Sequence, residues 1–120
     1  MEAPKIFESE YRFCLILWDN EPVSSGKLVQ LAKDGLGWSK ATTYTVIRRL
    51  SERGVLKNEN TIVSSLISKE EAQKSRLEEM VEETFEGSMP AFIAAFSKTK
   101  KLTRQEVDQL KALIDSFEEE

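Results

Sequence analysis

The spacing of apolar residues along the chain changes at Gly54, and this change limits the possible folds more than any other part of the sequence. Before it, side chains that can be buried recur at the spacing of one helix face, at Thr43, Val46, Ile47 and Leu50. After it, the β-prone segments 55–57 and 61–64 flank the polar turn 58–60 and predict a small hairpin. Few folds of 120 residues place a hairpin directly after an amphipathic helix.

Two more helices are predicted ahead of this segment. The first is expected to begin at the N-cap Ser9 and to end before the polar stretch 19–22. The second is expected to begin at Ser24 and to end at Gly35, because a glycine in the left-handed conformation commonly ends a helix. Ser39 is the expected N-cap of the third helix. Three helices and a hairpin predict a winged helix-turn-helix DNA-binding domain over residues 1–67.

Residues 68–120 are predicted to form three further helices, two of which open with capping boxes at Ser68 and Thr103. Each helix has one apolar stripe, and a lobe of about 50 residues rarely builds a sufficient core alone. We therefore expect a helical dimerisation region and a homodimer, with the contact made by Leu77, Met80, Val81, Phe85, Met89, Phe92, Ile93, Phe96, Leu110, Leu113, Ile114 and Phe117. The predicted fold class is mainly α with a small β-hairpin.

The composition excludes several kinds of chemistry. The chain has no histidine and a single cysteine, Cys14, so we predict no metal site, no cofactor, no small-molecule substrate and no enzymatic activity. Cys14 is expected to be a buried core thiol rather than a redox sensor. The longest apolar run, residues 13–18, is far shorter than the ~20 residues that span a bilayer. We expect a cytoplasmic protein without membrane insertion.

The net charge of −4 argues against a nucleic-acid partner, but the charge is unevenly distributed. Residues 38–57 carry five basic side chains and one acidic side chain. Because short donors and flanking cations suit a helix that enters a major groove, we predict that the third helix binds double-stranded DNA. The candidate contacts are Ser39, Lys40, Thr42, Tyr44, Thr45, Arg48 and Arg49.

Other interpretations of this helix stay open. Its composition fits an ordinary solvated surface helix equally well, and Tyr44 fits packing on a neighbouring arginine. Arg49 fits a structural salt bridge to an acidic residue of the first two helices. Glu59, expected at the tip of the hairpin, would repel phosphate, so we expect the hairpin to add little to DNA binding. The acidic charge and short hairpin suit an alternative function, a protein-interaction module that has lost DNA binding.

Three stretches of the chain are similar to one known family. Residues 9–18 resemble an opening helix of the pattern S-x-x-E-W-x-V-M-x-x-x-W, and residues 86–96 and 102–113 are similar to the tail of that family. The most specific stretch is W-S-x-x-T-x-x-T-x-x-x-R-L-x-x-x-G, which Trp38, Thr42, Thr45, Arg49 and Gly54 match. The chain thus resembles the BlaI/MecI/CopY penicillinase repressors, which are bacterial transcriptional regulators.

This resemblance implies a homodimer whose winged-helix lobes bind a two-fold operator and whose tails interlock. It also implies a membrane sensor-protease partner, because the antibiotic-responsive members are inactivated by cleavage just before a phenylalanine that matches Phe96. The preceding residue is Ala95 here, where the cleaved members have asparagine. Lys40, Ala41 and Tyr44 also depart from the usual residues of the family and imply an altered operator or weaker DNA binding.

Overall fold

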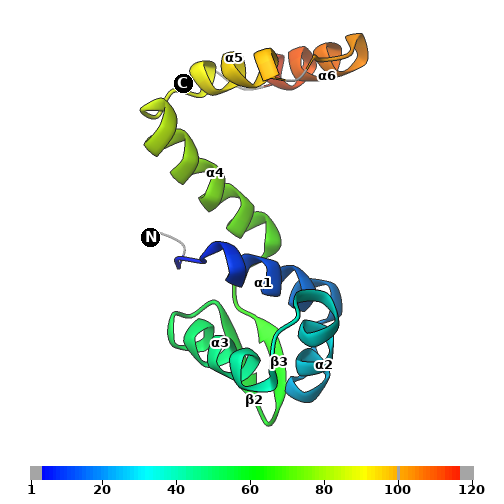
Figure 1. Ribbon diagram of the computed structural model, residues 1–120. Coiled ribbons are helices and arrows are strands. Elements are labelled where there is room, and N and C mark those ends of the chain that lie inside the picture. Colours follow the sequence, from blue (N-terminus) through cyan, green and yellow to red (C-terminus); the bar gives the residue numbers. More distant parts are fainter. Residues whose placement is uncertain (1–3, 100, 117–120) are drawn as a thin grey trace. The chain divides into compact units, whose positions relative to one another are not determined.

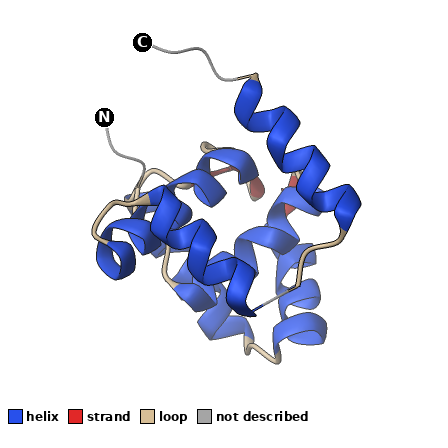
Figure 2. Cartoon of the chain, turned by 90° about the horizontal axis from the view of Figure 1, so that it is seen from above, coloured by secondary structure: helices blue, strands red, loops and turns tan. Residues whose placement is uncertain are grey.

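The computed structural model describes residues 4–99 and 101–116, and the chain forms two compact units, Met1–Leu77 and Glu78–Glu120. Helices dominate both units and the strands are short (Figures 1 and 2). The elements of the first unit are α1 (Glu8–Asn20), β1 (Val23–Ser24), α2 (Ser25–Leu36), α3 (Lys40–Glu52), β2 (Leu56–Glu59) and β3 (Ile62–Ser65), followed by the start of α4 (Lys69–Phe85). This order confirms the predicted winged helix-turn-helix fold.

The hairpin belongs to a three-stranded antiparallel sheet in the order β1-β3-β2. The two-residue strand β1 was missed by the sequence prediction, since it is held only by pairing Val23 with Val63 and Ser24 with Ile62. The predicted tip at 58–60 was wrong. The turn consists of Asn60 and Thr61, which both have positive φ (52° and 67°), and Glu59 is the last residue of β2. Two successive left-handed residues give the tight turn that suits strand twist.

The core of the first unit lies where the three helices meet the sheet. Phe13, Leu17, Leu28, Leu50 and Val63 are fully buried there. Further along, the Phe13 ring stacks on Trp38 with centroids 5.6 Å apart. Cys14 is 1% exposed, which confirms the buried thiol, and burial raises its pKa to about 12. Full burial of these large side chains makes the unit a rigid support for the exposed face of α3.

Two helix ends differ from the prediction. The N-cap of α1 is Phe7 rather than Ser9. The Glu10 carboxylate accepts from the Phe7 backbone N–H at 2.9 Å and so caps the helix start from its first turn. Helix α2 continues through Gly35, and Gly37 is its left-handed end (φ 71°). The half-buried Leu36 extends the apolar face of α2 by one residue, which favours the later stop. The N-caps Ser24 and Ser39 are confirmed.

The second unit holds the rest of α4 and the helices α5 (Met89–Thr99) and α6 (Arg104–Asp115). Both predicted capping boxes are present, Ser68 with Glu71 and Thr103 with Glu106. No residue of α5 or α6, all of which are described, is buried, and Met89, Ile93, Phe96, Leu113 and Ile114 are markedly exposed. Phe117 lies outside the described residues. Within the described ranges, no helix has the length and apolarity needed to cross a membrane.

Candidate nucleic-acid interface

Helix α3 presents one buried and one solvent-facing side. Thr43, Val46, Ile47 and Leu50 are buried, as the spacing predicts, and the Thr43 hydroxyl donates to the Ser39 carbonyl at 3.0 Å. The candidate residues on the other side are exposed, except Thr45, which is half-buried. The buried side of α3 thus anchors the helix to the core of the first unit, and the opposite side presents the candidate residues to solvent.

The start of α3 is organised by two hydroxyl groups. Ser39 Oγ accepts from the Thr42 backbone N–H at 3.1 Å and lies 3.0 Å from Thr42 Oγ1, to which it donates. The proton of the Thr42 hydroxyl is left to donate outward. Lys40 is exposed in the first turn, where the helix dipole and the free N–H groups attract anions. The N-terminal turn of α3 is thus a set of hydrogen-bond donors.

Tyr44 lies toward α2 and the hairpin turn. Its hydroxyl is 3.4 Å from Ser25 Oγ, and the Ser25 backbone N–H donates to the Thr61 carbonyl at 2.7 Å. Ser25 is buried, while 37% of Tyr44 is exposed. The tyrosine therefore connects the first turn of α2 to α3 and leaves part of its ring open to a partner.

The C-terminal half of α3 holds the arginines. Arg48 Nε is 3.7 Å from Glu52 Oε1, and both side chains are about two-thirds exposed (68% and 69%). Solvent screens such a pair, so the Arg48 charge is still available to an anion. Arg49 is also exposed and lies on the same flank of α3 as Thr42, seven residues earlier.

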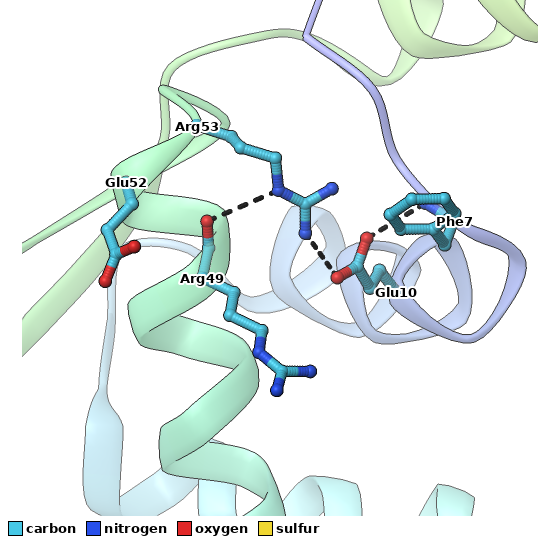
Figure 3. Close-up of a pocket in the computed structure, with 5 residues that line it drawn as sticks. All are labelled: Phe7, Glu10, Arg49, Glu52 and Arg53. Atoms are coloured by element: carbon cyan, nitrogen blue, oxygen red, sulfur yellow. Dashed lines mark hydrogen bonds and ion pairs between the residues drawn. The ribbon is translucent and has the colours of Figure 1, made fainter.

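Arg53 forms the ion pair that the sequence suggested as an alternative for Arg49. Its Nη2 binds the Glu10 carboxylate and its Nη1 donates to the Lys5 carbonyl at 2.8 Å. Figure 3 shows the Arg49 side chain apart from this pair, and within residues 4–99 and 101–116 its guanidinium has no hydrogen bond or ion pair. Sequence reasoning missed Glu10, although its spacing to Phe13, Cys14 and Leu17 places it on the buried face of α1.

The hairpin carries no net positive charge, because Lys57 is its one cation and Glu59 its one carboxylate. Lys57 Nζ is 3.3 Å from Glu59 Oε1 on the same strand, and the turn residues Asn60 and Thr61 are uncharged. The prediction that the hairpin adds little to DNA binding agrees with this pairing, and it stays a prediction.

Comparisons with known proteins point to one family. The profile of the penicillinase repressors matches residues 6–116. The methicillin resistance regulatory protein MecI of Staphylococcus aureus is 21% identical over 115 residues, covering 92% of this chain and 94% of the relative. MecI of Mammaliicoccus sciuri is 20% identical with the same coverage.

One solved structure shows the same fold. It is the solution structure of the monomeric form of Bacillus licheniformis BlaI in complex with the blaP half-operator, with a TM-score of 0.52 and 20% identity. The similarity covers 59% of this chain and 93% of the BlaI chain.

Proposed function

This chain belongs to the penicillinase repressor family, and from that membership we propose that it represses transcription as a homodimer bound to a two-fold DNA operator. The observation that carries the proposal is α3, whose exposed face combines the hydroxyl donors Thr42 and Thr45 with the cations Arg48 and Arg49. In this proposal α3 lies in the major groove. Its threonines contact base edges, while Ser39 and Lys40 bind phosphates at the helix start.

The exposed apolar side chains of the second unit support the homodimer. Met89, Ile93 and Phe96 are each more than 40% exposed on α5, and Leu113 and Ile114 are more than half exposed on α6. Burial of such side chains against a second copy would remove them from water. Ile93→Glu should therefore give a monomer in light scattering at micromolar concentration, while Ala91→Glu, on the opposite side of α5, should stay dimeric. A dimeric Ile93→Glu would contradict this contact.

Regulated proteolysis of the tail is a further part of the proposal. A membrane sensor-protease would cut between Ala95 and Phe96, a bond that lies inside α5. Because a protease binds extended backbone, this helix must open locally before it is cut. Mass spectrometry of the chain from induced cells should find a fragment that ends at Ala95. An intact chain during full derepression would contradict regulation by this cleavage.

The alternative function, a winged-helix protein-interaction module, is favoured by two observations. The hairpin cation Lys57 is paired with Glu59, and the whole chain is acidic. This module would use the same exposed face of α3 for a protein partner and would have no preference among DNA fragments.

A salt titration on DNA separates the two functions. The protein is titrated onto duplex DNA from upstream of its own gene, and onto a shuffled fragment of equal length, at several salt concentrations. A repressor should bind the first fragment selectively and as two cooperative protomers, with affinity falling steeply as salt rises. Equal or absent binding on both fragments would contradict the repressor and favour the module.

A further inference from the structure

One flank of α1 holds the start of α4 (Figure 1). Glu8, Tyr11 and Trp18 lie on this flank, because residues three and seven positions apart recur on one side of a helix. The Trp18 indole N–H donates to the Ile67 carbonyl at 3.1 Å, two residues before α4 begins. The Trp18 and Tyr11 rings meet edge to face, with centroids 5.8 Å apart. This flank therefore binds the chain at the point where it enters α4.

The same flank binds α4 again, two turns into the helix. Arg76 Nη2 donates to Glu8 Oε2 at 2.7 Å, and the guanidinium carbon lies 4.0 Å from the centroid of the Tyr11 ring. One turn earlier, Ala72 is 2% exposed and packs into the core. We call the contacts of Arg76 with Glu8 and Tyr11, together with that of Trp18, the α1–α4 clamp. Because the clamp holds α4 at two separate points, it opposes a tilt of the helix.

Helix α4 carries the effect of the clamp beyond the first unit. It runs from Lys69 to Phe85, whereas the first unit ends at Leu77. With a rise of about 1.5 Å per residue, about 14 Å of α4 follows Arg76. A tilt of about 10° at Arg76 would therefore move Phe85 by about 2 Å. The clamp fixes the direction in which the chain leaves the winged-helix unit.

This direction matters to a dimer on a two-fold operator. In the proposed function the second units join the two copies, and each α4 connects that junction to one winged-helix unit. One base pair inserted between the half-sites moves them about 3.4 Å apart and rotates one by about 35° relative to the other. Two winged-helix units on clamped helices can follow such a change only by breaking contacts of the clamp.

We propose that the α1–α4 clamp selects the spacing of the operator half-sites, with Arg76 as its positioning residue. This inference rests on the proposed function. Arg76 acts through α1 rather than through the DNA, so its removal should loosen the choice of spacing and leave the grip of α3 on one half-site intact. The Arg76 side chain is 36% exposed, so it can be removed while Ala72 stays packed in the core.

A series of operators with different spacing tests this proposal. Footprinting of the wild type on DNA from upstream of its gene locates the operator and its two-fold centre. Dissociation constants are then measured on this operator, on the same duplex with one or two base pairs inserted at the centre, and on one half-site alone. The half-site measurement separates the choice of spacing from the binding of α3.

The variants are Arg76→Ala and Arg76→Lys, and circular dichroism at the assay temperature checks that each is folded. Arg104→Ala is the matched control, because it removes an exposed arginine of α6 outside the clamp. Glu8→Gln weakens the clamp from the α1 side and replaces Arg76→Ala if that variant does not fold.

The wild type and Arg104→Ala should bind the native spacing more tightly than either insertion. For Arg76→Ala this preference should fall by about two- to fivefold per protomer, the factor that one cation–π contact supports, while half-site affinity stays unchanged. Arg76→Lys keeps a cation that can lie over Tyr11 and should keep most of the preference.

A full wild-type preference in Arg76→Ala would overturn the inference. An equal loss of affinity on every duplex, the half-site included, would also overturn it and indicate a role in folding alone. So would a wild type that binds the operator selectively as a dimer but equally well at every spacing. A wild type without selective binding would instead reject the proposed function itself.

Discussion

Arg76 lies over the ring of Tyr11, with the guanidinium carbon 4.0 Å from the ring centroid. The same guanidinium donates to Glu8 at 2.7 Å, so a residue of α4 binds two residues of α1 within the first unit. Nearby, Ala72 is 2% exposed in the core and the Trp18 indole N–H donates to the Ile67 carbonyl at 3.1 Å. The first turns of α4 are thus part of the winged-helix unit.

Removal of the Arg76 side chain should lower the stability of the first unit. A cation over an aromatic face contributes about 0.5–1 kcal/mol at a partly exposed site, so Arg76→Ala, which also removes the Glu8 contact, should lower the free energy of unfolding by at least that amount. Urea unfolding followed by circular dichroism measures it. Arg104→Ala, which removes an exposed pair with Asp108, is the control and should change the free energy far less. Equal losses in the two variants would contradict a specific stabilising role for the contacts of Arg76 with Tyr11 and Glu8.

Stability should fall in acid through two carboxylates at helix starts. The Arg76 guanidinium lowers the pKa of Glu8 from 4.5, and the Ser68 backbone N–H lowers the pKa of Glu71 from the same value. A carboxylate with a lowered folded-state pKa stabilises the fold above pH 4.5, and this contribution is lost as the pH falls through the folded-state pKa. Urea unfolding between pH 7 and 3 should therefore show a smaller acid loss for Glu8→Gln and Glu71→Gln. Curves parallel to the wild type would contradict this assignment.

Glu10 and Arg53 should depend strongly on each other. Glu10→Leu alone leaves the Arg53 guanidinium without its carboxylate and should cost about 3 kcal/mol of folding free energy. Glu10→Leu combined with Arg53→Met removes both charges and should recover most of that loss. The double-mutant cycle is measured by urea unfolding. Additive losses would show that the two side chains are energetically independent.

Glu52 should weaken DNA binding in the proposed function. Its carboxylate is exposed on α3 beside Arg48, where it opposes a phosphate backbone. Glu52→Gln should therefore raise affinity for any duplex by about 1 kcal/mol, or roughly fivefold, at low salt. The gain should disappear as salt rises. Glu86→Gln, after the end of α4, is the control with the same charge change, and an equal gain there would indicate a net-charge effect alone.

Cys14 should be inert in the folded protein. Burial raises its pKa to about 12, so almost no thiolate is present at neutral pH. Ellman's reagent should label Cys14 only after urea unfolding, at the rate of the unfolding step. Rapid labelling of the native protein at pH 8 would contradict the burial of this thiol.

Local signals predicted much of the fold correctly. Ser24, Ser39, Ser68 and Thr103 begin helices because a hydroxyl oxygen can accept from a backbone N–H three residues later, which depends only on nearby residues. The buried stripe of α3 follows from helix periodicity in the same way. Strand β1 could not be predicted, since two residues have no periodicity and the strand exists only through its pairing with β3.

In the candidate site, too, some features follow from local spacing and others depend on tertiary packing. The spacing of α3 was enough to predict which of its side chains face solvent and that threonines and arginines gather there, because helix geometry fixes the direction of each side chain. It left open whether Arg49 would pair with an acidic residue of the first two helices. Arg53 binds Glu10 and Arg49 stays apart because of the way the first turn of α1 packs against the end of α3. Glu10 and Arg53 are 43 residues apart in the chain, so no local pattern predicts this contact.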